Sequence, residues 1–361
     1  MKILVIYASA GAGHWKAAQA LYEGISKSAK DEVVLVDALD RTSPFFKKLY
    51  RGSYSLLISR FPWLWGSFFG LADLGWIQPF LRTGRRLFNR LNADALHCFL
   101  QKEKFDCILS THFFPTEVAS ALKRKGRIPS RIVTVVTDFD VHKIWLAQGV
   151  DVYTVASDWT KGKLKTLGIK ARICVCGIPT GEKFRVSQDV GLLKKRLGLK
   201  EDLFTVLMAT GSFGIGPIEQ IVAALEGFQV IVVCGNNRSL FARLSRHKRE
   251  LVKVMGLVDN MHELMGVCDV LVTKPGGLSI SEALVSRLPM VFFHAIPGQE
   301  RNNIRVLGRY GIGAYPCSVK GIVEELNQLR SSRDAFLTAI RATQQLARPS
   351  AVEDIITLIH E

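Results

Sequence analysis

Short runs of valine, isoleucine and leucine recur along the chain, and each is bounded by glycine or by polar residues. Such continuous apolar runs predict the strands of a parallel sheet that is covered on both faces. In the first half they occupy residues 2–8, 33–38, 105–111, 132–138 and 152–157. In the second half they occupy residues 204–212, 229–235, 252–258, 269–273 and 289–293.

Helical segments separate these runs, and the glycine- and proline-bearing stretch 177–190 interrupts the alternation. A chain of 361 residues also exceeds the usual size of one hydrophobic core. The predicted fold class is therefore α/β, with two Rossmann-like doubly wound domains that face each other across a cleft. We expect one domain at 1–180, a second at 190–334, and a C-terminal helix at about 335–361 that packs back on the first.

The composition favours a globular cytoplasmic protein. The chain is 48% apolar and 22% charged. Its start, MKILVIYASAGAGH, is typical of a strand and a glycine loop rather than of a signal peptide. The seven cysteines are scattered and odd in number, which indicates reduced thiols rather than disulfides or a structural zinc site.

Positive charge is concentrated in the first half. The net charge is +16, of which residues 1–180 carry +12, from 26 Lys and Arg against 14 Asp and Glu. Residues 45–88 hold 12 of the 33 aromatic side chains and seven basic residues, against the single acid Asp73. Proline and glycine interrupt this segment, so a membrane-spanning helix is not expected. Its mixture of aromatic and basic residues instead indicates a surface that lies in the headgroup layer of an anionic membrane.

Two other interpretations of residues 45–88 stay open, namely stacking of the aromatic rings on RNA bases and a core-packing insertion. The RNA interpretation fits poorly because polar base-reading residues are few, so no nucleic-acid partner is expected. The membrane-facing candidates are Trp63, Trp65, Phe68, Phe69 and Trp76.

Three glycine-bearing turns follow strands of the second half: GSFGIG at 211–216, CGNN at 234–237 and KPGG at 274–277. Glycine lets a ligand approach the backbone closely, and a helix that starts behind it offers free N–H groups to a phosphate. Because the carboxyl ends of parallel strands meet at one edge of the sheet, these turns together predict a nucleotide site. The candidates are Gly214, Gly216, Asn236, Gly276 and Gly277.

Polar side chains beyond these turns suit the rest of a nucleotide sugar. Glu282 lies in the helix after Gly277, where its carboxylate would accept hydrogen bonds from both hydroxyls of a ribose. The alternative is an acid that stabilises the helix dipole. Gln299 and Asn303 follow the next strand, and their amides suit the hydroxyls of a sugar, although a solvated loop would have the same composition.

Several stretches match one known family. They are SAGAGHWKAAQAL, TDFDVHKIW, GIPTGEKF, GSFGIGPI, GLVDNMHELM, DVLVTKPGGLSISEAL and AIPGQERNN, and they span nearly the whole chain. The sequence resembles glycosyltransferase family 28, in particular its monogalactosyldiacylglycerol synthases and bacterial diacylglycerol glucosyltransferases. The resemblance implies the two-domain GT-B architecture, with acceptor and membrane binding in the first domain and UDP-sugar binding in the second.

The resemblance also implies residue roles and a reaction. It assigns phosphate contacts to Gly276, Gly277 and Ser279, the ribose to Glu282, the uracil to the backbone of Val258, and the donor sugar to Gln299 and Asn303.

The implied reaction moves glucose or galactose, with inversion, from UDP-glucose or UDP-galactose to diacylglycerol, and it needs no cofactor or metal. We expect the enzyme to act as a peripheral protein on the inner face of the cell membrane. The alternatives are a lipid-linked N-acetylglucosaminyltransferase of peptidoglycan synthesis and a non-catalytic nucleotide-sugar or RNA-binding protein.

Histidines and acids at strand ends of the first half are the catalytic candidates. His14 ends the first glycine loop, and a neutral imidazole there would take the proton of an acceptor hydroxyl. The alternative is a histidine that only orders the loop. Asp138 is expected to orient His14 or to hold the acceptor hydroxyl, while His142 and Trp145 are expected to line the acceptor path.

Two further features of these strand ends are weaker. His112, in STHFFP, is a lesser candidate of the same kind as His14. The motif Asp138-Phe-Asp140 has the form of the metal-binding DxD of other glycosyltransferases. Since glycine loops already supply a phosphate site in the other half, no metal is expected.

Overall fold

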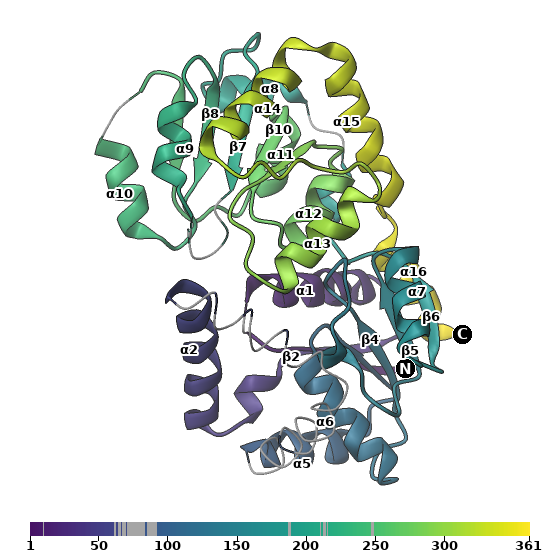
Figure 1. The fold of residues 1–361 in the computed structure, drawn as a ribbon. Coiled ribbons are helices and arrows are strands. Elements are labelled where there is room, and N and C mark those ends of the chain that lie inside the picture. The colour runs from purple at the N-terminus through teal and green to yellow at the C-terminus, as the bar shows by residue number, and fades with distance from the viewer. Residues whose placement is uncertain are drawn as a thin grey trace. The chain divides into compact units, whose positions relative to one another are not determined.

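The computed structural model describes residues 1–9, 11–60, 63, 66, 70, 84, 92–186, 189–209, 211, 214, 216–246 and 249–361, and only the backbone of residues 53–60. The chain divides into two compact units, each built around one parallel sheet (Figure 1). The first unit contains Met1–Gly181, Ile296–Asn302 and Arg348–Glu361. The second contains Glu182–Ala295 and Asn303–Ala347.

The first sheet has six parallel strands in the order β2-β1-β3-β4-β5-β6. In this register Ile6 lies opposite Ser110, so the residues that follow β1 and β3 leave the sheet side by side. The strands are β1 (Lys2–Tyr7), β2 (Glu32–Asp37), β3 (Cys107–Ser110), β4 (Arg131–Val135), β5 (Val152–Val155) and β6 (Arg172–Val175).

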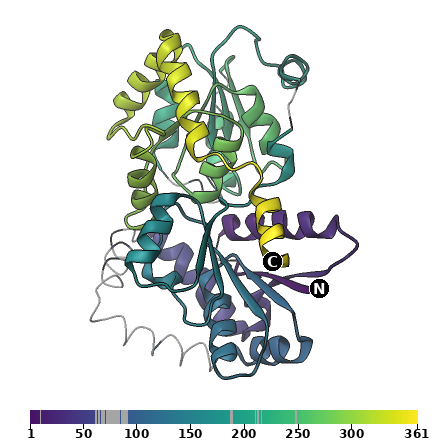
Figure 2. The ribbon, with the colours of Figure 1, turned by 90° about the vertical axis from the view of Figure 1, so that its right-hand side faces the viewer.

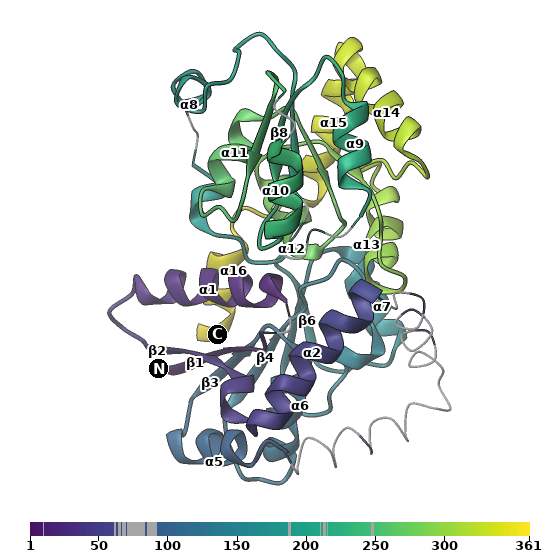
Figure 3. The same cartoon turned by 90° about the vertical axis from the view of Figure 1, so that its left-hand side faces the viewer.

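Helices cover both faces of the first sheet because successive side chains of each buried strand point to opposite faces. Ile3 and Val5 pack with α1 (Ala12–Ser26) and α16 (Ala351–His360), which lie side by side in Figure 2. Leu4 and Ile6 pack in the opposite core. That core includes residues of α2 (Pro44–Arg60), α5 (Asp94–Glu103), α6 (Phe113–Arg124) and α7 (Asp158–Thr166), and Figure 3 shows α2, α5 and α6 on this face.

The second sheet has five parallel strands in the order β11-β10-β7-β8-β9. They are β7 (Thr205–Ala209), β8 (Gln229–Val233), β9 (Val252–Met255), β10 (Val270–Thr273) and β11 (Met290–Phe292). One core contains side chains of α9 (Ile218–Ala224), α10 (Arg238–Arg246), α14 (Val319–Ser331) and α15 (Arg333–Leu346). The remaining helices are α8 (Val190–Arg196), α11 (Met261–Val267), α12 (Gly277–Val285) and α13 (Gln299–Gly308), with short turns η1 (Ala38–Arg41), η2 (Lys143–Trp145) and η3 (Glu182–Phe184).

The predicted fold class is confirmed in its two parallel-sheet α/β units, and each predicted strand is present. Several strands are shorter than their apolar runs suggested. The run at 132–138 forms a strand only over Arg131–Val135, because the polar residues Thr137 and Asp138 have left the sheet for the loop that carries the site. Buried polar residues such as Thr137 and Asp138 therefore follow directly after the strand.

The C-terminal helix differs from its prediction at about 335–361. It is two helices, α15 and α16, and only α16 belongs with the first unit. Pro349 explains the interruption, since proline lacks an N–H and disfavours helical backbone in the residue before it. The helix has already ended at Ala347, whose ψ of 129° is extended. Residues 296–302, expected in the second domain, also belong with the first unit.

Candidate active site

His14 is held by residues that follow two other strands of the first sheet. It lies in the first turn of α1, after the loop that leaves β1. Its Nδ1 atom is 2.9 Å from the carbonyl oxygen of Thr111 and 2.9 Å from the hydroxyl oxygen of Thr137. The Thr111 hydroxyl donates in turn to the backbone carbonyl of His14 at 2.9 Å. Thr111 therefore fixes both the ring and the backbone of His14.

This geometry selects one tautomer of His14. A carbonyl oxygen only accepts hydrogen bonds, so Nδ1 must carry the proton that points to Thr111. The neutral ring then has its lone pair on Nε2, and no residue in the described part of the chain bonds to that nitrogen. Nε2 is thus left in the state that a general base requires.

The surroundings of His14 keep its ring neutral. Burial lowers the pKa of His14 to about 4, and the hydrogen bond to the Thr111 carbonyl offsets only part of this shift. The imidazole is therefore unprotonated at pH 7, as a base must be. Because so low a pKa makes a weak base, proton transfer has to accompany bond formation to an electrophile rather than precede it.

Two other rings lie beside the His14 imidazole. The ring centres of His112 and Trp145 lie 4.6 Å and 6.1 Å from that of His14. Trp145, a predicted acceptor residue, is therefore placed beside the predicted base. His142, its predicted companion, is also buried, and its Nδ1 accepts a hydrogen bond of 3.1 Å from the backbone N–H of Ile144, which caps η2.

Asp138 and Gln299 lie together in the first unit. The side-chain amide nitrogen of Gln299 is 2.7 Å from each carboxylate oxygen of the buried Asp138. The structure thus joins two residues that the sequence analysis assigned to different substrates. Thr111 and Thr137, which hold the His14 ring, were not predicted from the sequence, although both are polar residues at the ends of buried apolar runs.

The second acid of the DxD-like motif has a cationic partner. The Lys163 ammonium lies 2.7 Å and 2.8 Å from the two carboxylate oxygens of Asp140. Within the described residues, no group of three or more His, Cys, Asp or Glu side chains is placed to share a metal ion. The motif is therefore part of an ion pair and a hydrogen-bonded network.

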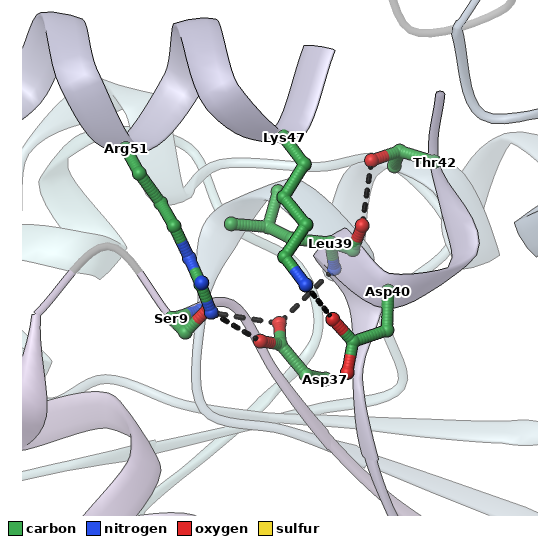
Figure 4. A network of polar contacts seen from close by, with 7 residues as sticks. All are labelled: Ser9, Asp37, Leu39, Asp40, Thr42, Lys47 and Arg51. Atoms are coloured by element: carbon green, nitrogen blue, oxygen red, sulfur yellow. Dashed lines mark hydrogen bonds and ion pairs between the residues drawn. The ribbon is translucent and has the colours of Figure 1, made fainter. Parts of the chain in front are cut away.

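The beginning of the 45–88 segment is anchored to strand ends of the first sheet (Figure 4). Arg51, in α2, donates from Nε to the Ser9 hydroxyl at 2.9 Å and from Nη2 to Asp37 at 3.2 Å. Asp37 also accepts from the backbone N–H of Ser9 at 3.2 Å, and Lys47 pairs with Asp40. Two of the seven basic residues of this segment are therefore used inside the protein.

Two apolar side chains near the start of α2 face solvent. Phe45 is 72% exposed and Leu49, one helical turn later, is 45% exposed. Trp63, a predicted membrane residue, is 65% exposed. The other predicted membrane residues, Trp65, Phe68, Phe69 and Trp76, lie outside the described residues. No helix in the described part of the chain has the length and apolar character needed to cross a bilayer.

In the second unit, the KPGG turn leads into the start of α12. Gly276 is the N-cap residue, and no side chain caps the helix. A Cβ atom added to Gly276 would meet no atom within 4 Å, so the backbone is open at the point where N–H groups are free. The side-chain amide of Asn303 donates to the carbonyl of Pro275 at 3.0 Å and holds this turn. Asn303 thus has a structural contact here in addition to its predicted sugar contact.

The other predicted donor residues of the second unit differ in burial and backbone conformation. Gly277 and Glu282 are buried in α12, whereas Ser279 and Val258 are partly exposed. Gly214 and Gly216 have φ angles of 59° and 129°, which glycine adopts readily. Asn236 is exposed, and its neighbour Asn237, which the sequence analysis did not select, donates to the carbonyl of Gly214 at 3.3 Å. Backbone conformation thus requires the glycines of this turn, whatever ligand it binds.

The two parallel-sheet units have the GT-B fold, as superposition on solved structures shows. The chain superposes on MurG from Acinetobacter baumannii with a TM-score of 0.62 and 12% identity, covering 99% of each chain. It superposes on HepE from Anabaena, in complex with UDP-glucose, with a TM-score of 0.58 and 14% identity, covering 100% of this chain and 99% of the other. These likenesses show the fold, and they agree with the predicted GT-B architecture.

Sequence comparison identifies the relatives. The model of the monogalactosyldiacylglycerol (MGDG) synthase family matches residues 14–180. A processive diacylglycerol β-glucosyltransferase from Bacillus cytotoxicus is 28% identical over 372 aligned positions, which cover 100% of this chain and 93% of the relative. The chain is thus related in sequence to the diacylglycerol-glycosylating enzymes of glycosyltransferase family 28, and the resemblance drawn from its motifs is confirmed.

The pKa of His14 is open to direct measurement. We expect the ring to stay neutral from pH 8 down to about 5 and to take up a proton near pH 4, because burial destabilises the charged form. NMR titration of the histidine Cε1–H signals, assigned with His14→Asn, measures this value. An inflection near the ordinary value of 6.5 would contradict the assignment of a desolvated, neutral base.

Because the backbone at Gly276 is open, a substitution there can change ligand affinity without a large change in stability. We expect Gly276→Ala to lower the free energy of unfolding by no more than about 1 kcal/mol, because alanine is a poorer N-cap than glycine, but the φ of −76° suits alanine and the added methyl meets open space. The same methyl should weaken UDP binding by about tenfold or more, since it occupies the space of a diphosphate. Calorimetric titration with UDP measures the affinity. As a contrast, Gly214→Ala is expected to lose stability, because φ is 59° and its Cβ would lie 2.8 Å from the Asn237 amide. Unchanged UDP affinity in Gly276→Ala would place the diphosphate elsewhere.

Proposed function

We propose that the protein transfers glucose from UDP-glucose to diacylglycerol with inversion, giving a β-linked glycolipid. The observation that carries this proposal is the tautomer of His14, whose Nδ1 is held by Thr111 and whose Nε2 has no partner in the described part of the chain. The name of the Bacillus cytotoxicus relative supports the acceptor and the sugar. The likeness to the UDP-glucose complex of HepE supports the donor.

The transfer step is a single displacement. The glycerol hydroxyl oxygen attacks the anomeric carbon, the bond from that carbon to the UDP oxygen breaks, and the hydroxyl proton passes to His14 Nε2. UDP leaves with the electron pair of the broken bond. Since the nucleophile and leaving group lie on opposite sides of the carbon, the configuration inverts.

The departing diphosphate needs positive electrostatic potential. The uncapped start of α12 supplies free N–H groups and the positive end of the helix dipole. This would stabilise the developing charge on the leaving group as an oxyanion hole does. Glu282, buried in the same helix, is the candidate for the ribose, as predicted from its position.

The extent of each sequence match supports glucose rather than galactose in this proposal. The family model that is named for galactose transfer covers residues 14–180, which lie in the first unit. The relative that is named for glucose transfer aligns with the whole chain. The predicted donor-binding residues Gly276, Ser279 and Glu282 lie in the second unit. Only the whole-chain match therefore includes the unit that would select the sugar.

Membrane docking is assigned to residues 45–88 together with anionic lipids. Phe45 and Leu49 give α2 an exposed apolar edge, and Trp63 adds an exposed indole. Exposed aromatic and aliphatic side chains beside basic residues are typical of surfaces that lie in the headgroup layer. A peripheral position at the inner membrane surface would bring the site to an acceptor whose acyl chains stay in the bilayer.

Turnover with defined substrates tests the proposed reaction. Release of UDP is measured with UDP-glucose or UDP-galactose and with vesicles that contain diacylglycerol or a lipid pyrophosphate. We expect UDP-glucose and diacylglycerol to give the fastest release. His14→Asn should reduce kcat about 10²- to 10⁴-fold, because it keeps a donor for Thr111 but removes the base, and should leave UDP affinity unchanged. Preference for the lipid pyrophosphate would favour a peptidoglycan-type transferase, and no turnover with any acceptor would refute an enzyme of either kind.

Vesicle binding tests the docking surface. We expect the double variant Phe45→Ser/Leu49→Ser to bind phosphatidylglycerol vesicles several-fold more weakly, because it removes exposed apolar area that would enter the headgroup layer. Its UDP affinity should not change. Leu337→Ser, at a residue of α15 that is 39% exposed, is the matched control and should bind vesicles normally. Equal vesicle binding by the double variant and the control would remove α2 from the docking surface.

A further inference from the structure

His112 lies beside the proposed base, but the transfer step above gives it no role. It is 2% exposed and is the N-cap residue of α6. Its Nδ1 atom accepts a hydrogen bond of 3.1 Å from the backbone N–H of Phe114. A nitrogen that accepts from an N–H has its lone pair in that direction and carries no proton. The neutral ring therefore carries its proton on Nε2.

The Nε2–H group of His112 is a donor without an acceptor. No residue in the described part of the chain accepts from it. The Nε2 atom is not fully enclosed, because the fully buried side-chain N and O atoms without a partner in the described residues are Thr154 Oγ1 and Arg185 Nε. A ligand can therefore reach this donor and complete its hydrogen bonding. Burial also lowers the pKa of His112 well below its ordinary value, and nearby His14 adds to this shift. The ring thus stays a neutral donor.

The two histidines are fixed in opposite tautomers. Thr111 leaves His14 with an acceptor at Nε2, and Phe114 leaves His112 with a donor at Nε2. Their ring centres are 4.6 Å apart and their planes cross at 80°. One small ligand that carries a hydroxyl and a nearby carbonyl oxygen can therefore pair with both nitrogens. The pair is complementary to a ligand that donates one hydrogen bond and accepts another a few atoms away.

Aromatic rings lie beside the pair. The ring centre of His112 lies 4.2 Å from that of Phe113, 6.2 Å from that of Tyr50 and 6.4 Å from that of Trp145. Such surroundings lower the local dielectric and strengthen each hydrogen bond that forms. They also suit the part of a lipid where the glycerol meets its acyl chains.

We propose that His112 binds the acceptor by donating from Nε2–H to the ester carbonyl oxygen next to the hydroxyl that His14 deprotonates. This inference rests on the proposed function and names a residue that selects an acylglycerol. A donor on the attacking oxygen itself would withdraw electron density from the nucleophile, so the neighbouring carbonyl is the favoured partner. No bond to His112 forms or breaks, and its proton stays on Nε2 throughout.

A matched pair of variants separates this role from helix capping. His112→Asn keeps an acceptor at the position of Nδ1 for the Phe114 N–H, and asparagine is a good N-cap residue, but it has no donor at Nε2. His112→Gln places an amide donor near the position of Nε2 and loses the cap geometry. We expect His112→Asn to raise the KM for diacylglycerol about tenfold while the thermal midpoint and UDP affinity stay near wild type. We expect His112→Gln to be less stable yet closer to wild type in KM.

A second readout uses the wild-type protein and an altered acceptor. A dialkylglycerol has the same hydroxyl but no ester carbonyl. We expect wild-type kcat/KM to fall about tenfold with this acceptor and that of His112→Asn to fall little, because the lost contact is the same in both cases. Equal kcat/KM of the wild type with both acceptors would overturn the inference, as would a normal KM for diacylglycerol in His112→Asn. If the wild type transfers no sugar to diacylglycerol at all, the proposed function itself fails.

Discussion

The hydrogen bond from His14 Nδ1 to the Thr111 carbonyl determines which nitrogen of the imidazole is available for chemistry. That bond depends on the parallel pairing of β1 with β3, in which Ile6 lies opposite Ser110 and the Thr111 N–H donates to the Ile6 carbonyl at 3.0 Å. Residues that follow the two strands therefore emerge in a fixed relation to each other. The tautomer of one side chain is thus a consequence of sheet register, and so is the state of its neighbour His112 at the start of α6.

The sequence pattern was sufficient for the architecture and for the general position of the site. Continuous apolar runs predicted every strand except β6, because strands buried on both faces are apolar at every position, whereas β6 lies at the sheet edge and begins with the exposed Arg172. The division of α15 from α16 could also have been predicted, since Pro349 stands in the sequence. The membership of residues 296–302 in the first unit could not, because it arises from tertiary contacts such as that between Gln299 and Asp138.

Within the site, the sequence located histidines and acids but not what they touch. His14 and Trp145 lie together as expected from their strand ends. Thr111 and Thr137 were missed because a threonine that ends an apolar run resembles any strand residue, and only the register shows that both reach one ring. Similarly, the glycines of the 211–216 turn were interpreted as room for a ligand, whereas Gly214 and Gly216 are already required by their positive φ angles. The basic residues of 45–88 were counted as membrane-facing, yet Lys47 and Arg51 neutralise acids of the same unit.

The packing of α16 against α1 has a consequence for biogenesis. Gly24 of α1 leaves room for Val352, because a Cβ there would lie 2.4 Å from the valine Cγ1 atom, and Ile355 and Leu358 of α16 cover Ile3 and Val5 of the first strand. Translation proceeds from the N-terminus, so the first sheet is synthesised long before residues 351–360 leave the ribosome. Until then one of its faces lacks part of its apolar cover. The apolar cover of the first unit is therefore completed only after the second unit has been synthesised.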